Sequence, residues 1–500
     1  MNNGKICVSV CAPTLNVLQD TIERASSVCD LIELRLDCID APNAAVSGVN
    51  IKPNMILTRR PREQGGNNDL DLSERQEFWT TQSFSCGADL EEDVIRSVTN
   101  NFDPTICSFH DFNYSRGSLD EVYSRLAATD ADVLKIAIST HDITDAIEVW
   151  KLLKRAESDG RQLIPIAMGE AGKWTRILGL AHGAYLTYAA PDTDSATAPG
   201  QITAREMIDV FRVKELDEST EVYGIIAGDT TYTMSPYIHN AAFKAAGINA
   251  VFVPLQVKDL DTFMRRMVLP ATREIELNFR GFSVTNPHKQ AIIRHLDHVD
   301  DAAAKIGAVN TVKIENGKLI GFNTDAQGFI APLAEKFGDL NDARAAVIGA
   351  GGAARACVYS LKNAGASVTI FARDSEKVRL LGDEFCVDMV QLSADSSQLK
   401  ADFSYFDIVV NATPLGTRGK GENETIATAN QLRDVKLVYD LIYNPSETRL
   451  LREAKLVGAQ TLGGFEMLMA QAAEQFKIWT GQPAPIDEMI AAAQKRLNES

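Results

Sequence analysis

Residues 345–355 read A-A-V-I-G-A-G-G-A-A-R, an apolar strand that runs straight into a glycine-rich turn and then into a helical pattern. The spacing of Gly349 and Gly351, with alanine at the third position, fits G-x-G-x-x-[G/A]. In that setting, backbone N–H groups and the N-terminus of the helix receive a pyrophosphate. We therefore predict a dinucleotide-binding turn in which Gly349, Gly351, Gly352 and Ala353 contact the cofactor.

The next apolar strand, S-V-T-I-F-A, ends directly before Arg373. A fold that binds NAD tends to offer an acid to the ribose 2′-hydroxyl at this point, whereas an arginine accommodates the 2′-phosphate of NADP. The alternative is a surface arginine paired with Asp374, a carboxylate that would itself repel a phosphate. The pattern favours NADP, with NAD as the second choice.

Strands and helices alternate on both sides of this turn, from about residue 222 to the C-terminus. The spacing predicts two α/β lobes, over 222–330 and 331–463, with a join near 325–342. A helix over 464–478 is expected to pack back, so that 464–500 completes the first lobe. The expected strands are VYGIIAG (222–228), VFVPLQ (251–256), RGFSVT (280–285), TVKI (311–314), AAVI (345–348), SVTIFA (367–372), IVVNAT (408–413) and LVYDL (437–441).

Polar residues end two strands of the first of these lobes. G-F-S-V-T-N-P-H-K ends at Lys289, and G-F-N-T-D ends at Asp325. A lysine and an aspartate brought together can exchange a proton with a substrate hydroxyl while hydride passes to a nicotinamide. Taken singly, each is an ordinary surface charge.

The chain before residue 212 has a different period. Eight short apolar segments alternate with helical stretches, which predicts a (β/α)8 barrel over 1–216. The charged, glycine-free segment R-V-K-E-L-D-E-S-T-E places the boundary at 216–221. The expected strands are KICVSV (5–10), LIELRL (31–36), NMILT (54–58), FSCGADL (84–90), TICSF (105–109), DVLKIAI (132–138), LIPIAM (163–168) and AYLTYA (184–189).

Lys135 lies inside one of these apolar strands, in V-L-K-I-A-I. A buried ammonium without a partner is costly, and a depressed pKa would leave a nucleophilic amine suited to a Schiff base. The alternative is a lysine whose head reaches solvent or pairs with Glu33. His110 follows the preceding strand, so both should reach the same mouth, where histidine can move protons.

Length and composition restrict the classes of protein to which this chain can belong. The chain has 500 residues, which predicts about three domains, and its net charge of −17 disfavours a nucleic-acid partner. No apolar run reaches membrane-spanning length, and the first residues resemble neither a signal nor a transit peptide. The eight cysteines form no C-x-x-C pair, so we expect reduced thiols in a cytoplasm. No His/Cys set suggests a metal site.

The barrel half resembles the type I 3-dehydroquinate dehydratases. The matching motifs are E-L-R-L-D (33–37), L-T-R-R-P with G-G (57–66), F-H-D-F (109–112), K-I-A (135–137), I-A-M-G (166–169), R-I-L-G (176–179) and A-P-G-Q-I (198–202). The resemblance implies an imine between Lys135 and the C3 ketone of 3-dehydroquinate, with His110 taking a C2 proton and Arg176 holding the carboxylate. It also implies a pocket lined by Glu33, Arg35, Arg60, Thr197 and Gln201.

One position departs from that family. The usual R-x-x-x-E-G-G has Gln64 in place of its glutamate, which keeps the hydrogen-bonding shape but loses the charge. Glu63 could replace it only if the loop shifted. We therefore expect reduced but not abolished dehydration.

Residues 222–485 resemble shikimate dehydrogenases. Further matching motifs are T-M-S-P-Y-I-H-N (233–240), N-A-T-P-L-G-T (411–417), Y-D-L-I-Y-N-P (439–445), G-G-F-E-M-L (463–468) and Q-A-A (471–473). The resemblance makes Lys289 and Asp325 the catalytic pair. It places Thr233, Ser235, Thr285, Asn310 and Gln471 around 3-dehydroshikimate, and Asn411 and Thr413 on the cofactor side. Thr233 stands where serine is commoner, and A-R-D (372–374) stands where N-R-T is usual.

The product of the first implied reaction is the substrate of the second. The two resemblances together imply a bifunctional enzyme that converts 3-dehydroquinate to 3-dehydroshikimate and then, with NADPH, to shikimate, in the cytoplasm or, for a mature plant-type chain, in the plastid stroma. Two alternatives stay open. One is a quinate/shikimate dehydrogenase with a weakened dehydratase, and the other is a ligand sensor without catalysis.

Overall fold

The structure is a computed structural model that describes residues 2–82, 84–98, 102–115, 117–392, 401–419 and 421–499. The backbone forms two compact units. The first comprises residues 1–236 and 247–279, and the second comprises 237–246 and 280–500. The predicted boundaries at 216–221 and near 331 remain predictions.

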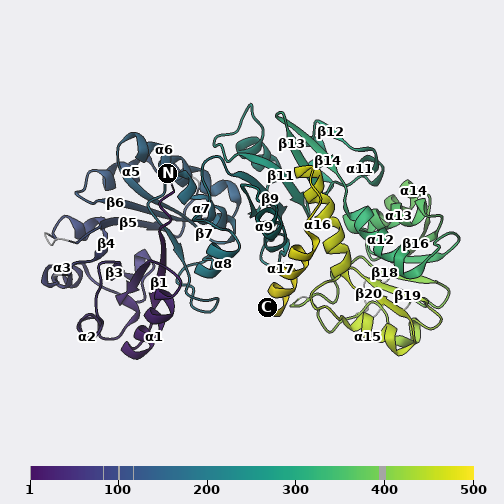
Figure 1. Ribbon diagram of the computed structural model, residues 1–500, viewed down its shortest axis with the longest axis horizontal. Coiled ribbons are helices and arrows are strands. Elements are labelled where there is room, and N and C mark those ends of the chain that lie inside the picture. The colour runs from purple at the N-terminus through teal and green to yellow at the C-terminus, as the bar shows by residue number, and fades with distance from the viewer. Residues whose placement is uncertain are drawn as a thin grey trace. The chain divides into compact units, whose positions relative to one another are not determined.

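Eight parallel strands form the centre of the first unit (Figure 1). Their order is β7-β6-β5-β4-β3-β2-β1-β8, and Tyr185 N donates to Leu163 O across the remaining gap, so the sheet curls into a nearly closed barrel. Each of the eight predicted segments overlaps one strand, which confirms the predicted barrel. The strands are β1 (Ile6–Cys11), β2 (Leu31–Arg35), β3 (Met55–Thr58), β4 (Gly87–Glu91), β5 (Thr105–Asp111), β6 (Val133–Ser139), β7 (Gln162–Met168) and β8 (Thr187–Ala189).

Helices connect the barrel strands and lie outside them (Figure 1). Local sequence explains where several begin. Asp71 and Glu74 form a reciprocal capping box at α3, as Thr203 and Glu206 do at α8, which satisfies free N–H groups of the first turn. The helices are α1 (Leu15–Ser26), α2 (Pro42–Gly48), α3 (Leu72–Thr81), α4 (Glu92–Ile95), α5 (Asp120–Ala127), α6 (Ile147–Ser158), α7 (Lys173–Leu178) and α8 (Ala204–Asp209).

Alternate residues of the strands fill the barrel interior, as the period of a strand requires. On β6, Val133 and Ala137 belong to an interior apolar cluster that also includes Ile106 of β5 and Tyr188 of β8. Lys135 lies between the two β6 residues in sequence and shares their face. The period that buries the strand therefore directs the lysine inward.

The first unit also contains the parallel pair β9 (Glu221–Ala227) and β10 (Ala250–Gln256), followed by α10 (Leu260–Phe263) and a π-helical turn, Met264–Val268. In the second unit, β13 (Thr311–Glu315) pairs antiparallel with both β11 (Phe279–Val284) and β14 (Lys318–Phe322). The short β12 (His298–Val299) pairs in parallel with β14. The helices of these regions are α9 (Ser235–Ala245), α11 (Asp301–Ile306) and α12 (Asp325–Phe337).

A six-stranded parallel sheet of Rossmann type forms the rest of the second unit, in the order β17-β16-β15-β18-β19-β20. This arrangement confirms the predicted dinucleotide fold. Its elements are β15 (Arg344–Ile348), α13 (Gly352–Asn363), β16 (Ser367–Ala372), α14 (Ser375–Phe385), β17 (Asp388–Gln391), β18 (Ile408–Asn411), β19 (Leu437–Asp440), α15 (Arg449–Leu456) and β20 (Gln460–Leu462).

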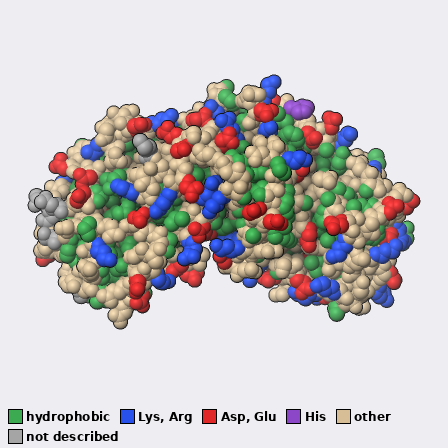
Figure 2. All heavy atoms as spheres, viewed as in Figure 1, with side chains coloured by type: hydrophobic (Ala, Val, Ile, Leu, Met, Phe, Trp, Pro, Cys, Tyr) green, Lys and Arg blue, Asp and Glu red, His purple; other side chains and the backbone are tan. Residues whose placement is uncertain are grey.

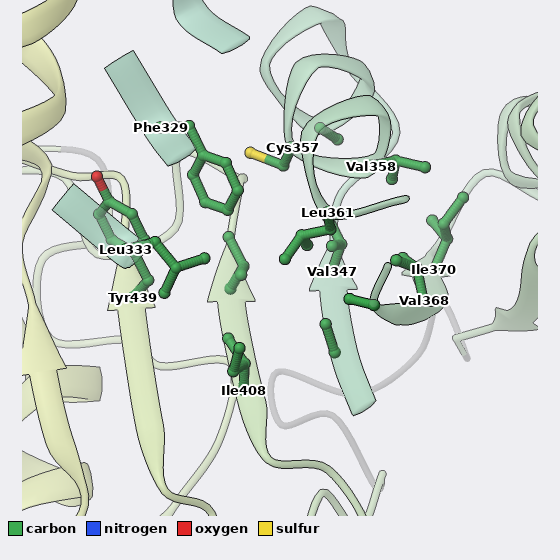
Figure 3. Close-up of a cluster of buried hydrophobic side chains, with 14 of the residues drawn as sticks. Phe329, Leu333, Val347, Cys357, Val358, Leu361, Val368, Ile370, Ile408 and Tyr439 are labelled. Carbon is green, nitrogen blue, oxygen red and sulfur yellow. The ribbon is translucent and has the colours of Figure 1, made fainter. Parts of the chain in front are cut away.

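The core of this sheet lies between its strands and the covering helices (Figure 3). Phe329 of α12 stacks on Tyr439 of β19, with ring centroids 5.1 Å apart. Cys357 of α13 points toward Phe329, and Leu361 of α13 and Val347 of β15 belong to the same buried cluster. Burying one such side chain contributes about 1.5–3 kcal/mol. These contacts fix the start of α13 relative to the end of β15.

Two helices end the chain, α16 (Gly464–Thr480) and α17 (Ile486–Glu499). Gln475 of α16 is buried, and its Nε2 donates to Thr311 Oγ1 at 3.0 Å and to Asn310 O at 3.2 Å, while its Oε1 accepts from Ser283 Oγ at 2.9 Å. The C-terminal segment is thus hydrogen-bonded to β11, the strand before Lys289, and to the start of β13, next to Asn310.

The cysteines require a correction. Cys11 and Cys38 form a disulfide, with Cα atoms 5.4 Å apart, so the expectation that all thiols are reduced is wrong for this pair. Sequence spacing did not reveal it, because the two residues are brought together by the pairing of β1 with β2. The other six are free, and all of them except Cys386 are buried.

Candidate active sites

One pocket at the carboxyl ends of the barrel strands is lined by every residue predicted for the first reaction. Catalytic residues are expected at this end of a (β/α)8 barrel. The lining residues are Glu33, Arg35, Arg60, Gln64, Gly65, His110, Phe112, Lys135, Ala137, Ile166, Met168, Arg176, Tyr188, Thr197, Ala198, Pro199 and Gln201.

Lys135 is buried in this pocket, with 6% of its side chain exposed. The interpretation in which its head reaches solvent is therefore wrong. Its Nζ lies 2.7 Å from Asp89 Oδ2 and 3.7 Å from Glu33 Oε1, and 4.2 Å from the ring centre of Tyr188. Glu33 is a partner, as one interpretation predicted, but Asp89 is the closer one.

Asp89 joins two of the cations of the pocket, Lys135 and Arg60. It also accepts from Arg60 Nη2 at 2.7 Å, and it is fully buried. Burial alone would raise the pKa of Asp89, but Arg60 and Lys135 hold it below its ordinary value. The carboxylate therefore stays ionised and keeps both cations in place.

His110 lies on β5 next to Lys135, since Ser108 pairs with Lys135 and His110 pairs with Ala137 in the β5–β6 register. Its Nδ1 is 3.0 Å from Arg60 Nη1. Burial, and then the cations Arg60, Lys135 and Arg35, lowers the pKa of His110 well below its ordinary value. The imidazole is consequently neutral at pH 7 and able to accept a proton.

The loop that carries Gln64 contacts His110 directly. Gln64 Oε1 accepts from the backbone N of His110 at 2.9 Å, whereas Glu63 is exposed. Glu63 therefore does not take the place of the missing carboxylate. His110 has an arginine, not an acid, beside its ring.

Arg176 is the unpaired cation of the pocket. It is buried, and its Nε and Nη2 have no hydrogen-bond partner among the described residues. Burial lowers the pKa of Arg176 to about 10, so the group is still charged at neutral pH. A buried guanidinium with free donors fits a carboxylate. The remaining predicted residues, Thr197 and Gln201, lie in the loop after β8, where Gln201 Oε1 accepts from Thr197 N at 2.8 Å.

Several residues in or next to the pocket were not predicted from the sequence. Asp37 accepts two hydrogen bonds from Arg35, of 2.9 and 2.7 Å. Asn67 N also donates to Asp37 Oδ2, at 3.2 Å. Asp89 and Tyr188 contact Lys135. The sequence did contain a sign of the role of Asp89. A carboxylate inside the apolar segment F-S-C-G-A-D-L is expected to be buried in the barrel, where it needs a cation as its partner.

The second site brings together the predicted lysine and aspartate. Lys289 Nζ lies 2.5 Å from Asp325 Oδ2, and Asn310 Nδ2 donates to Asp325 Oδ1 at 2.8 Å. Lys289 follows β11, and Asp325 is the first residue of α12, so the ends of β11 and β14 position the pair. Thr285 lies just after β11.

Gln471 projects from α16, where its Nε2 donates to Leu468 O at 3.0 Å and its Cβ lies beside Gly328. Thr233 and Ser235 belong to the first unit, at the start of α9, and Ser235 N donates to Thr233 Oγ1 at 3.3 Å. Their part in the second site remains a prediction.

The glycine turn fits a pyrophosphate. Gly349 has φ 125°, and a Cβ there would lie 2.9 Å from Ala412 O. A Cβ at Gly351 would meet no described atom within 4 Å, so open space lies before the turn. No described side chain caps α13, which begins at Gly352 and continues through Ala353, so its first N–H groups are available to bind an anion.

A carboxylate supports the neighbouring loop. Asp440 Oδ1 accepts from Asn411 Nδ2 at 2.9 Å, and Asn411 Oδ1 accepts from Thr413 Oγ1 at 2.7 Å. Burial raises the pKa of Asp440 to about 6. Asn411 and Thr413 thus end β18 next to the glycine turn, in a fixed conformation.

Arg373 is exposed directly after β16, where a 2′-phosphate would bind. Asp374 caps α14 by accepting from Lys377 N at 3.0 Å, and its carboxylate lies 3.3 Å from Lys377 Nζ. Lys377 therefore offsets the negative charge of Asp374, which would otherwise repel a phosphate.

Among the described residues, no three His, Cys, Asp or Glu side chains converge as a metal site would require. Nor does any described helix have the length and apolar character to cross a membrane.

Comparison with known families agrees with this geometry. The type I 3-dehydroquinase model matches residues 6–218. The shikimate dehydrogenase substrate binding domain matches 225–312, the shikimate/quinate 5-dehydrogenase model matches 332–443, and the shikimate 5′-dehydrogenase C-terminal domain matches 464–494. The chain therefore joins a (β/α)8-barrel lyase, of the class that works through a Schiff base, to a dinucleotide-dependent dehydrogenase.

Relatives define the family more closely. One relative is the bifunctional 3-dehydroquinate dehydratase/shikimate dehydrogenase, chloroplastic, of Arabidopsis thaliana. The two sequences are 32% identical over an alignment that covers 97% of this chain and 83% of the relative. This chain is also 40% identical, over 55% of its length, to 96% of the shikimate dehydrogenase (NADP(+)) of Methanocaldococcus jannaschii. The chain belongs to the bifunctional 3-dehydroquinate dehydratase/shikimate dehydrogenase family.

Solved structures agree for the second half. A shikimate dehydrogenase crystallised in complex with NADP+ matches 56% of this chain and 97% of its own, with 38% identity and a TM-score of 0.51. The corresponding enzyme of Aquifex aeolicus matches with 34% identity and a TM-score of 0.50.

Proposed function

We propose that the barrel dehydrates 3-dehydroquinate through an imine on Lys135. The observation that carries this proposal is a single pocket that combines a buried lysine with an unpaired buried arginine, Arg176. Arg176 holds the substrate carboxylate, which brings the C3 ketone toward Lys135 Nζ. Asp89 and Glu33 keep the amine in position before it reacts.

The steps follow from the groups present. Lys135 Nζ adds to the C3 carbonyl, and loss of water gives the imine. Neutral His110 then takes a proton from C2, and the electron pair expels the C1 hydroxyl, which leaves as water once protonated. Hydrolysis of the imine releases 3-dehydroshikimate and restores the lysine.

Reductive trapping tests this mechanism. Borohydride added with 3-dehydroquinate, in the absence of nicotinamide, should reduce the imine and leave a stable adduct on the peptide that contains Lys135. Peptide mass spectrometry locates the adduct, and borohydride alone is the control. An unlabelled Lys135 under turnover conditions would exclude the imine.

We further propose that the second half reduces 3-dehydroshikimate to shikimate. When bound, NADPH supplies the hydride. Lys289 donates a proton to the oxygen that becomes the hydroxyl, and Asp325 orients its amino group at a distance of 2.5 Å. Asn310 fixes the carboxylate, so the pair meets the substrate in one geometry.

The cofactor is NADP. The glycine turn offers free N–H groups, and Arg373 with Lys377 supplies cations for the 2′-phosphate. A coupled assay tests both activities, since 3-dehydroquinate with NADPH should oxidise the nicotinamide only if both sites work. The same assay with NADH should be slower, and Arg373→Ala should reduce the preference between the two. Equal rates with both cofactors would contradict the assignment.

Quinate is the second candidate substrate, favoured by Thr233 in place of the commoner serine. Comparing kcat/KM for quinate and shikimate, before and after Thr233→Ser, tests it. The non-catalytic sensor is disfavoured, because Lys135, His110, Lys289 and Asp325 are all present in paired geometry.

Small anionic molecules are the partners that this chain suits, and not nucleic acid. Its net charge is −17, and on the face in Figure 2 the basic and acidic side chains lie interspersed. We place the enzyme in the cytoplasm or a plastid stroma, a reducing compartment that the five buried free thiols support and the Cys11–Cys38 disulfide does not. Thiol labelling in intact cells tests this placement, and a fully oxidised Cys11–Cys38 pair there would contradict it.

A further inference from the structure

Arg355 has no role in the chemistry described so far. It lies in the first turn of α13, directly after the glycine turn, where an arginine would ordinarily reach solvent. Instead it is 7% exposed. A guanidinium is buried only where specific partners compensate for its lost hydration.

The partners of Arg355 come from two directions. Its Nε donates to the carbonyl of Ile306 at 2.5 Å, and its Nη2 pairs with Glu384 of α14. Ile306 is the last residue of α11, where carbonyl groups lack partners within the helix and a cation is favourable. Arg355 therefore joins the helix of the glycine turn to the end of α11.

The space around this contact is filled. Gly307 has φ 67°, and a Cβ built on it would lie 2.4 Å from Arg355 Nη2, so the guanidinium occupies the place of a side chain. Beside it, Ile306, Ala308 and Ala326 pack with Ala356 in a separate apolar cluster. The contact is a packed joint between α11, α12 and α13.

The segment that Arg355 holds, 306–310, leads directly to the catalytic pair. Val309 N donates to the carbonyl of Lys289 at 2.7 Å. Asn310 Nδ2 donates to Asp325 Oδ1 at 2.8 Å. Both members of the pair are thus hydrogen-bonded to residues that follow the Arg355 contact in the chain.

We infer that Arg355 is a positioning residue of the dehydrogenase, which ties the helix that receives the pyrophosphate to segment 306–310 and so aligns Lys289 and Asp325 with the bound dinucleotide. This inference rests on the proposed function, which assigns that pair. A misplacement of about 1 Å can cost about 10²-fold in rate. The link should therefore affect the rate of hydride transfer more than the affinity for either ligand.

Arg355→Gln is the primary test, with Glu384→Gln as its matched control. The control removes the second partner, whose side chain is 45% exposed, and leaves the Ile306 contact intact. Arg355→Gln should lower the dehydrogenase kcat by about 10- to 100-fold, with KM for NADPH and for 3-dehydroshikimate nearly unchanged. The deuterium isotope effect with labelled NADPH should rise, and Arg355→Lys should recover part of the rate. The control should change none of these.

A second pair of variants reaches the joint from the other side. Gly307→Ala would push against the guanidinium, whereas Gly317→Ala places the same residue at φ 75° with no described atom within 4 Å. The strain of a left-handed alanine is common to both. Only Gly307→Ala should reproduce the loss of kcat.

Amide exchange provides a readout without cofactor. In Arg355→Gln, the amide of Val309 should exchange faster than in the unmodified chain, and in Glu384→Gln it should not. Dehydratase turnover of the same chain reports the concentration of folded enzyme. An unchanged kcat, or a loss confined to KM for NADPH, would overturn the inference. If the unmodified chain failed to reduce 3-dehydroshikimate, the proposed function would fail instead, while the exchange result would still report the joint.

Discussion

The two active sites share a lysine–aspartate pair, and its surroundings differ. In the barrel, Lys135 lies 2.7 Å from Asp89, with side chains 6% and 0% exposed. In the dehydrogenase, Lys289 lies 2.5 Å from Asp325, with side chains 17% and 8% exposed. The first lysine must lose its proton to attack a carbonyl, whereas the second must keep a proton to donate. The same pair therefore serves opposite ends of acid–base chemistry.

The difference lies in what else each aspartate holds. Asp89 also binds Arg60, so Lys135 shares its counter-charge with a permanent cation. Asp325 is bound by Asn310, which is neutral, so Lys289 keeps the whole of its partner's charge. Asp89 is therefore a shared carboxylate, and Asp325 is an unshared one.

The largest difference between the two sites is expected when Lys135 is removed, because only the dehydratase activity should be lost. Lys135→Ala eliminates the nucleophile, and loss of a covalent catalyst typically costs about 10⁶-fold in kcat. Dehydration of 3-dehydroquinate, followed by the absorbance of the conjugated product, should fall to that extent. The dehydrogenase activity of the same chain should persist, and the exposed Lys154 of α6 provides a control as Lys154→Ala.

Lys289→Ala should have a smaller effect, because a proton donor contributes about 10²- to 10⁴-fold. NADPH oxidation with 3-dehydroshikimate measures it, with Lys305→Ala on the same lobe as the control. Dehydratase turnover should be unaffected. An equal loss in both activities would mean that the variant had unfolded, and a wild-type rate would remove Lys289 from the mechanism.

The aspartates should differ in what they contribute to stability. Asp89→Asn leaves Arg60 and Lys135 buried without a counter-charge, which should cost about 3–5 kcal/mol. Asp325→Asn leaves one lysine that reaches solvent, and should cost about 1–3 kcal/mol. Amide exchange of β6 and α12 in increasing urea measures both free energies of local unfolding. Equal costs would contradict the distinction between a shared and an unshared carboxylate.

The smallest effect is expected at Gln64. Gln64→Glu places a carboxylate beside His110 and should raise the dehydratase kcat severalfold. The increase should stay below the contribution of a whole general base, which is about 10²-fold or more. It should also raise the pKa of His110, which burial and three cations now lower. Dehydration should therefore remain constant as the pH falls through 6.5 in the unmodified enzyme, and begin to fall at a higher pH in the variant. Glu63→Gln, at an exposed position, should leave both unchanged.

Much of the fold followed from local pattern, because the interior of a barrel strand repeats every second residue and the glycine turn has its own spacing. Lys135 and Lys289 were found in this way. Asp89 was not, because the partner of a strand residue depends on which strands meet across the barrel. Arg355 was missed for a related reason, since an arginine in a helical pattern is buried only when a distant carbonyl, here that of Ile306, faces it.

The Cys11–Cys38 disulfide closes the segment from the end of β1, through α1 and β2, into a covalent loop. A protease that cuts within this loop leaves two fragments still joined, so the cut chain should migrate as an intact protein in a denaturing gel until a thiol is added. Electrophoresis with and without reductant would then show which molecules in a preparation contain the disulfide. Because the disulfide survives denaturation, it reports the oxidation state of Cys11 and Cys38 in each molecule even after the protein has unfolded.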